Sequence, residues 1–124
     1  EDLRAELGMA AMAIKIEPRI QKALEESNKV VLDGLYSWEE YVHLEGKFPT
    51  IELLCNYARP ETRYNRLANR MVRSLGRKEA ESRDVAEIEN LNKGGPIARA
   101  DYLIINEGTE EEFCKQLETY HSLL

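Results

Sequence analysis

A short apolar run that ends on an acidic residue and a glycine constrains this chain more than any other feature. Val30, Val31 and Leu32 are consecutive and apolar, which is typical of a strand buried on both faces. Asp33 and Gly34 then end the run. Open α/β sheets bind ligands at the carboxyl ends of their strands, so a ligand-facing role for Asp33 is one interpretation. The other is a plain turn, because Asp-Gly is common in turns.

Two further apolar runs follow, at 50–56 and 102–105, and segments with helical signals separate all three. Strands that alternate with helices pair in parallel through right-handed crossovers. We therefore expect an α/β chain in which a parallel sheet has flanking helices, with more helix than strand.

Capping residues, prolines and glycines give the expected helix boundaries. Ser37 with Glu40, and Thr109 with Glu112, have the spacing of capping boxes, which predict helices from about 38 to 46 and from 110 onward. The other expected helices are 2–14, Pro18 to about 27, Pro60 to about 70, and about 78 to 92, the last ended by Gly94, Gly95 and Pro96.

Charge is spread unevenly along the 124 residues. The formal net charge is −6, which argues against a general nucleic-acid binder, because phosphate neutralisation needs a basic surface. From Arg59 to Arg83, however, eight basic residues stand against three glutamates. Arg63, Arg66 and Arg70 recur at helical spacing on one face, and guanidinium groups suit phosphate oxygens. This basic island indicates a small anionic ligand, and a solvated basic face is the alternative.

The remaining reactive residues give weaker signals. Cys55 and Cys114 lack metal-type spacing, and we expect both to be reduced, buried and structural. His43 and His121 are interpreted as surface or packing residues. No apolar run approaches the roughly 18 residues of a membrane span, and no signal peptide is visible, so a cytoplasmic chain without membrane contact is expected.

Four segments, in this order, resemble the P-loop nucleotide kinases, and most closely the group related to adenylate kinase and dephospho-CoA kinase. They are Val-Leu-Asp-Gly-Leu at 31–35, Arg-Tyr-Asn-Arg-Leu-Ala-Asn-Arg at 63–70, Ser-Arg-Asp at 82–84, and Ala-Asp-Tyr-Leu-Ile-Ile-Asn-Glu-Gly-Thr at 100–109. The resemblance covers essentially the whole chain and implies one partial kinase-like domain over 1–124. Its implied parts are acceptor-side helices at 1–28, core strands and a helix at 29–58, a lid-like basic region at 59–92, and the last strand, base loop and helix at 93–124.

The resemblance also implies an activity and a set of site residues. The activity is phosphoryl transfer from ATP, with Mg²⁺, to a nucleotide-like or dephospho-CoA-like acceptor. Asp33 is similar to the family's magnesium-holding aspartate, and the loop from Asn106 to Thr109 is similar to the loop beside adenine. The implied roles are Arg70 and Arg83 as catalytic arginines, Arg66, Asn106, Gly108 and Thr109 for ATP, Arg4, Tyr36 and Ser37 for the acceptor, and Asp33 for the metal.

One part of the family pattern is missing from these residues. No glycine begins Gly-x-x-x-x-Gly-Lys-Ser/Thr, so we expect no kinase activity from this portion by itself. In the family, the strand before that loop lies between those corresponding to 29–33 and 50–56. Its absence would leave two rows of unpaired backbone groups, so we expect either a longer polypeptide or a homo-oligomer. The alternatives are a catalytically silent nucleotide-binding module and a scaffold whose basic helix meets an acidic protein.

Overall fold

The computed structural model describes residue 6 and residues 8–123. The chain forms two compact units, which we describe separately. Unit 1 contains the residues up to Ile51 together with Glu87–Arg99, and unit 2 contains Glu52–Ala86 together with the residues from Ala100 onward. Helix α5, Arg77–Leu91, begins in unit 2 and ends in unit 1.

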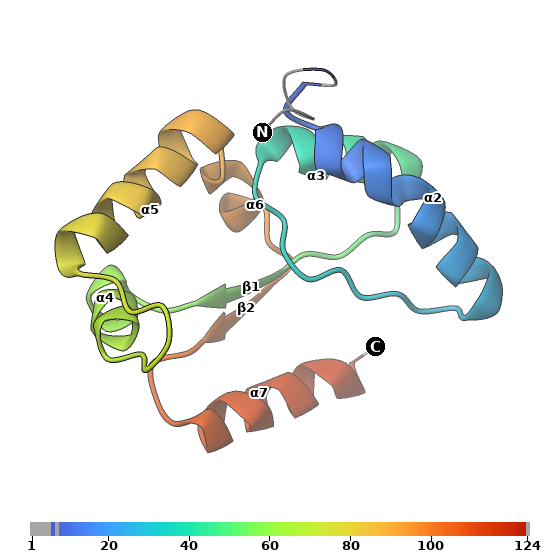
Figure 1. The fold of residues 1–124 in the computed structure, drawn as a ribbon. Coiled ribbons are helices and arrows are strands. Elements are labelled where there is room, and N and C mark those ends of the chain that lie inside the picture. The colour runs from blue at the N-terminus through green and yellow to red at the C-terminus, as the bar shows by residue number, and fades with distance from the viewer. Residues whose placement is uncertain (1–5, 7, 124) are drawn as a thin grey trace. The chain divides into compact units, whose positions relative to one another are not determined.

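Unit 1 is built on two helices that pack against each other, α2 (Ala11–Glu26) and α3 (Trp38–Lys47) (Figure 1). Its core consists of Ala13, Ile20 and Leu44. Partly buried side chains of Ile16, Leu35, Phe48 and Ile51 surround this core. The expected start of α3 is confirmed, because the Ser37 hydroxyl accepts a hydrogen bond from the Glu40 N–H at 3.1 Å.

Helix α2 differs from the two helices expected in this region. Residues 8–10 form a turn, with Gly8 at a φ of 87°, and the helix then runs through Pro18 without a break. A proline inside a helix costs about 3 kcal/mol because it removes one backbone hydrogen bond. The helix continues because its residues on both sides of Pro18, including Ala13 and Ile20, are buried in the core.

The segment that contains the 29–33 run is not a buried strand, so that prediction is wrong. Val31 is 89% exposed, and Leu32 and Asp33 are also exposed. Within the described residues, 30–36 form no backbone hydrogen bond. A strand is stable only when a neighbour pairs with its N–H and C=O groups, and the described chain supplies no such neighbour. The run therefore crosses unit 1 as an unpaired segment.

Unit 2 contains a two-stranded parallel sheet, which confirms the α/β class and the parallel pairing. Strand β1 is Leu54–Tyr57, shorter than the expected 50–56, and β2 is Tyr102–Ile105, as expected. Helix α7, Glu110–Ser122, lies along β2 (Figure 1). The Gln116 side-chain oxygen accepts from the Ile105 N–H at 3.2 Å, and its Nε2 donates to the Ile105 carbonyl oxygen at 2.8 Å. A helix side chain therefore covers part of the outer edge of β2.

Two further helices, α4 (Pro60–Ala68) and α5, carry the basic island. The expected boundaries hold to within two residues, but α5 ends differently from the expectation. Asn92, at a φ of 55°, follows its last residue, and Gly94 and Gly95 begin the short helix α6, Gly94–Ala98. Gly95 permits a close approach in unit 1, because a Cβ there would lie 2.6 Å from the Trp38 ring.

The two cysteines occupy different environments. Cys55 is partly buried in β1, whereas Cys114 is exposed on α7, so the expected burial is wrong for Cys114. Phe113, Leu117 and Tyr120 on the same helix are partly buried. Neither cysteine forms a disulfide. None of the described helices is long and apolar enough to cross a membrane.

Candidate functional site

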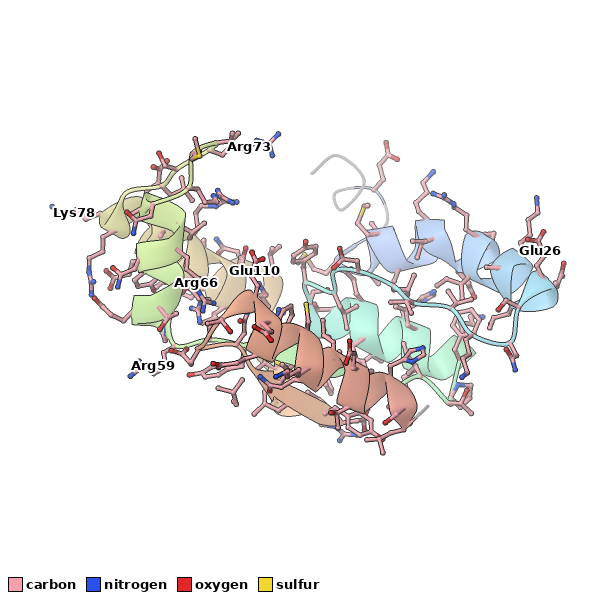
Figure 2. The ribbon with its side chains drawn as sticks, turned by 90° about the horizontal axis from the view of Figure 1, so that it is seen from below. Glu26, Arg59, Arg66, Arg73, Lys78 and Glu110 are labelled. Atoms are coloured by element: carbon pink, nitrogen blue, oxygen red, sulfur yellow. The ribbon has the colours of Figure 1, made fainter. Side chains whose placement is uncertain are left out.

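Unit 2 brings the predicted ATP-side residues into one cluster. Arg66, in the last turn of α4, donates from Nη1 to the Asn106 carbonyl oxygen at 2.8 Å and from Nη2 to that of Gly108 at 3.4 Å (Figure 2). Both carbonyls belong to the loop that joins β2 to α7. Thr109 closes this loop, since its hydroxyl accepts from the Glu112 N–H at 3.1 Å. Four residues that the resemblance grouped therefore lie together.

Local interactions hold this loop in its position. The N–H of Asn106 donates to the Tyr57 carbonyl oxygen at 2.7 Å, which continues the strand pairing by one residue. Gly108 lets the exposed Glu112 carboxylate lie close to the loop, because a Cβ at this position would make that flexible side chain move away. The loop thus begins on the sheet and ends on the first turn of α7, at the carboxyl end of a parallel strand where α/β proteins bind ligands.

Glu107 holds the same loop against the beginning of α4. Its carboxylate accepts hydrogen bonds from the Arg59 N–H at 2.5 Å, the Arg59 Nε at 3.2 Å and the Thr62 hydroxyl at 2.5 Å. These bonds, that from Thr62 above all, lower the pKa of Glu107. Sequence reasoning assigned no role to Glu107, Thr62 or Arg59. One signal was present, since Arg59 precedes Pro60 and is not a capping residue.

The lowered pKa of Glu107 predicts a loss of stability in acid. Its contribution is fully present above the ordinary glutamate pKa of 4.5 and is lost as the pH falls through the lower folded-state pKa. We expect urea midpoints measured from about pH 5 to pH 3 to fall less steeply for Glu107→Gln than for the wild type. Glu110→Gln, at an exposed carboxylate, is the control and should keep the wild-type slope. Equal slopes for Glu107→Gln and the wild type would contradict this assignment.

Part of the basic island is neutralised by the chain itself. Arg63 pairs with Asp84 and also donates to the Ala58 carbonyl oxygen at 2.6 Å. Arg77 pairs with Glu61 at 2.6 Å. We expected an outside anion to relieve the charge repulsion along the whole arginine series. For Arg63 and Arg77 this is wrong, because internal carboxylates neutralise them and the two ion pairs connect α4 to α5.

Tyr64 lies at the centre of this α4–α5 contact. The guanidinium carbons of Arg63 and Arg77 are 5.9 and 5.7 Å from the centre of its ring. Its hydroxyl donates to Asp84 at 2.9 Å, and this hydrogen bond, together with burial, raises the pKa of Tyr64. The contact fixes the helix that carries Arg66.

Four arginines of the island have no carboxylate partner among the described residues: Arg66, which bonds the loop carbonyls, and Arg70, Arg73 and Arg83. Arg70 donates to the Arg73 carbonyl oxygen at 2.5 Å, and Arg73 itself has a φ of 55°. Figure 2 shows Arg73 in the connection that follows α4. Arg83 is exposed on α5. Both predicted catalytic arginines are thus available for an anion, although no described contact joins them to the Arg66 cluster.

The predicted metal and acceptor residues belong to unit 1. Asp33 is exposed, and the described residues contain no group of three or more His, Cys, Asp or Glu that could hold a metal ion. The Tyr36 ring lies 5.5 Å from the Lys93 Nζ. Ser37 is fully buried, and its hydroxyl is engaged with Glu40 at the start of α3. Arg4 lies outside the described residues.

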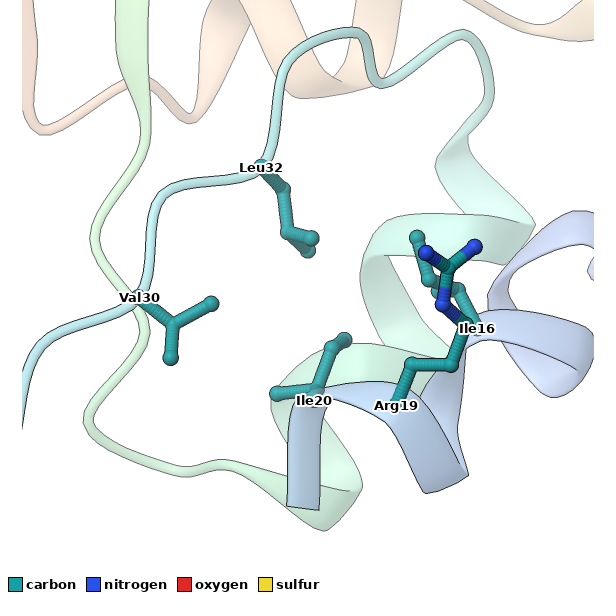
Figure 3. A pocket seen from close by; sticks show the side chains of 5 residues that line it. All are labelled: Ile16, Arg19, Ile20, Val30 and Leu32. Atoms are coloured by element: carbon teal, nitrogen blue, oxygen red, sulfur yellow. The ribbon is translucent and has the colours of Figure 1, made fainter. Parts of the chain in front are cut away.

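Unit 1 also contains an apolar hollow beside α2 (Figure 3). Its volume is about 220 Å³, and it is lined by Ile16, Arg19, Ile20, Val30 and Leu32. Val30 and Leu32 belong to the unpaired run, which accounts for the partial burial of Val30. Asp33 is not among the lining residues, so this hollow does not include the predicted metal ligand.

Fold and site define an α/β protein in which a basic helix and a strand-to-helix loop form one polar cluster. The chain belongs to the UPF0200 protein family. The UPF0200 protein of Pyrococcus furiosus is 34% identical over 128 aligned positions, which cover 98% of this chain and 67% of that protein. The corresponding protein of Thermococcus gammatolerans is 35% identical over 121 positions, with 94% and 63% covered.

The relatives extend beyond the region that this chain matches. In the UPF0200 protein of Methanothermobacter thermautotrophicus, 32% identity over 116 positions covers 92% of this chain and 60% of the relative. The chain thus spans about three-fifths to two-thirds of the length of these relatives. No family model matches the chain. No solved structure matches it either. The shared family name states no activity.

Proposed function

We propose that this chain is part of an ATP-dependent kinase of the P-loop class, which transfers the γ-phosphoryl group of ATP to a nucleotide-like or dephospho-CoA-like acceptor. The observation that carries the proposal is the pair of hydrogen bonds from Arg66 to the carbonyl oxygens of Asn106 and Gly108. They join a basic helix to a strand-to-helix loop, two parts that the kinase resemblance placed on the ATP side.

The proposed roles are assigned to the arginines that no carboxylate of the described chain neutralises. Arg66 and the loop that ends at Thr109 would hold the nucleoside side of ATP. Arg70 and Arg83, which lack carboxylate partners in the described chain, would neutralise the charge on the transferred phosphoryl group. This chemistry needs positioned positive charge more than covalent participation by the protein.

For magnesium we propose Asp33. Asp33 is one exposed carboxylate, and this fits Mg²⁺, which keeps several waters and commonly takes one or two carboxylates together with substrate phosphates. In this role Mg²⁺ neutralises phosphate charge. Tyr36, Ser37 and Arg4 are proposed on the acceptor side. Ser37 is fully buried and its hydroxyl caps α3, so its part would be to hold the start of α3 in place rather than to contact the acceptor.

The proposal needs a phosphate loop from outside these 124 residues, because none of the glycines here begins that motif. The relatives contain additional length beyond the matched region, where such a loop would lie. The activity of a complete protein is thus part of the proposal.

Calorimetry with Mg-ATP tests the ATP site. We expect the double variant Arg66→Ala/Arg70→Ala to bind at least about tenfold more weakly than the wild type, because each charge-assisted hydrogen bond contributes about 1.5–3 kcal/mol. Lys15→Ala/Lys22→Ala, on the exposed side of α2, removes the same charge and should leave the affinity unchanged. Unchanged affinity in the arginine variant would show that the lid assignment is wrong.

A second candidate function is a protein-interaction module without catalysis. It is favoured by the connection between α4 and α5, where Met71 is 100% and Val72 is 72% exposed beside Arg70 and Arg73. An apolar tip flanked by positive charge suits an acidic protein surface. Absence of Mg-ATP binding in the longest form of the polypeptide would favour this candidate over the kinase.

A further inference from the structure

The beginning of α4 lacks a cap from its own sequence. Arg59 occupies the N-cap position with a φ of −59° and a ψ of 150°, and its side chain makes no capping hydrogen bond. Pro60 follows at the first helical position. The start of a helix leaves backbone N–H groups unsatisfied and carries a partial positive charge, so it requires an acceptor from another part of the chain.

Glu107 supplies that acceptor from a distant part of the sequence. In a capping box, the acidic residue at the third helical position accepts from the N-cap N–H. Thr62 occupies that position in α4, and Glu107 instead accepts from both the Arg59 N–H and the Thr62 hydroxyl, at 2.5 Å each. The carboxylate thus caps α4 through tertiary contacts, and the positive end of the helix favours its negative charge.

The same loop is attached to α4 at a second point. Arg66, seven residues after Arg59, donates to the carbonyl oxygens that flank Glu107 in the loop. Seven residues of helix correspond to about 10 Å. Two attachments, one at the start of α4 and one in its last turn, fix both the position of the loop along α4 and the direction of its carbonyl groups. With Arg66 alone, the loop could rotate about one contact.

We propose that Glu107 is a positioning residue, which fixes the loop against α4 so that Arg66 and the Asn106 and Gly108 carbonyl groups form the nucleoside side of the ATP site. This inference rests on the proposed function. Glu107 itself is not assigned a contact with ATP, because its carboxylate is occupied by Arg59 and Thr62.

Calorimetry with two ligands tests the inference against a purely structural role. We expect Glu107→Ala to weaken Mg-ATP binding about tenfold and to leave the affinity for inorganic tripolyphosphate unchanged, because Arg70 and Arg83 would bind the phosphates. Glu107→Gln keeps an acceptor oxygen and should recover part of the loss. Glu110→Ala changes the net charge equally and should bind both ligands as the wild type does. Equal weakening of both ligands by Glu107→Ala, or no weakening at all, would overturn the inference.

A second measurement needs no nucleotide. The guanidinium N–H protons of Arg66 should exchange slowly with solvent in the wild type, observed by NMR, and faster in Glu107→Ala. Equal exchange in the two proteins would overturn the positioning role. If the longest form of the wild-type polypeptide binds no Mg-ATP, the proposed function fails, and the Arg66 exchange rates alone decide whether Glu107 positions the loop.

Discussion

Replacing Leu44 with alanine is expected to lower the free energy of unfolding of unit 1 by about 3 kcal/mol. Leu44 is only 2% exposed and forms the core of this unit with Ala13 and Ile20. Truncation removes buried apolar surface and also leaves a cavity that its neighbours fill only in part. Two of those core residues lie on α2, so the substitution weakens the contact between α2 and α3.

Trp38 makes this loss measurable in unit 1 alone, because it is the single tryptophan of the sequence and packs against Gly95 within that unit. Urea unfolding followed by its fluorescence gives the free energy. Val42→Ala, at a half-exposed position on the same helix, is the matched control and should cost less than about 1 kcal/mol. Equal losses for the two variants would mean that the α2–α3 core is not packed as described.

Ile104→Ala is expected to destabilise unit 2 by about 3 kcal/mol, whereas Leu103→Ala should cost less than about 1 kcal/mol. The two residues are neighbours on β2, yet Ile104 is 4% exposed and Leu103 is 58% exposed. Successive strand residues point to opposite faces of the sheet. The two variants therefore compare the loss of a buried and of an exposed side chain within one strand.

Amide hydrogen exchange at Asn106 measures this difference, because its N–H bonds the Tyr57 carbonyl oxygen beside the β1–β2 ladder. Ile104→Ala should accelerate exchange there far more than Leu103→Ala. A larger effect from Leu103→Ala would indicate that the opposite face of the sheet is the buried one, as it would be if another strand or helix covered Leu103.

Local sequence signals predicted several elements correctly. The caps Ser37 and Thr109 lie where expected, because the hydroxyl and the N–H it accepts are three residues apart. The strand 102–105 was also correct. The run at 29–33 was not, since the same apolar residues suit a buried strand or an exposed segment according to whether a partner strand is present. Pro18 was misjudged for a similar reason, because packing on both sides of it outweighs its local cost.

The candidate site was also predicted from the sequence only in part. The resemblance to P-loop kinases grouped Arg66 with Asn106, Gly108 and Thr109, and unit 2 places these residues together. It gave no role to Glu107. Short-range spacing could not reveal that role, because Glu107 lies 48 residues after Arg59, the N-cap residue of the helix that it caps.

For this protein, the sequence by itself determined the α/β class, the parallel pairing of two strands, the capped starts of α3 and α7, and a basic island in an acidic chain. These properties depend on residue type and short spacing. Only the tertiary structure decided which arginines remain available, since carboxylates far along the chain neutralise Arg63 and Arg77 and leave Arg70 and Arg83 without such a partner in the described residues. It also decided that Val30–Leu32 stays unpaired, because strand pairing requires a neighbour that the run cannot supply.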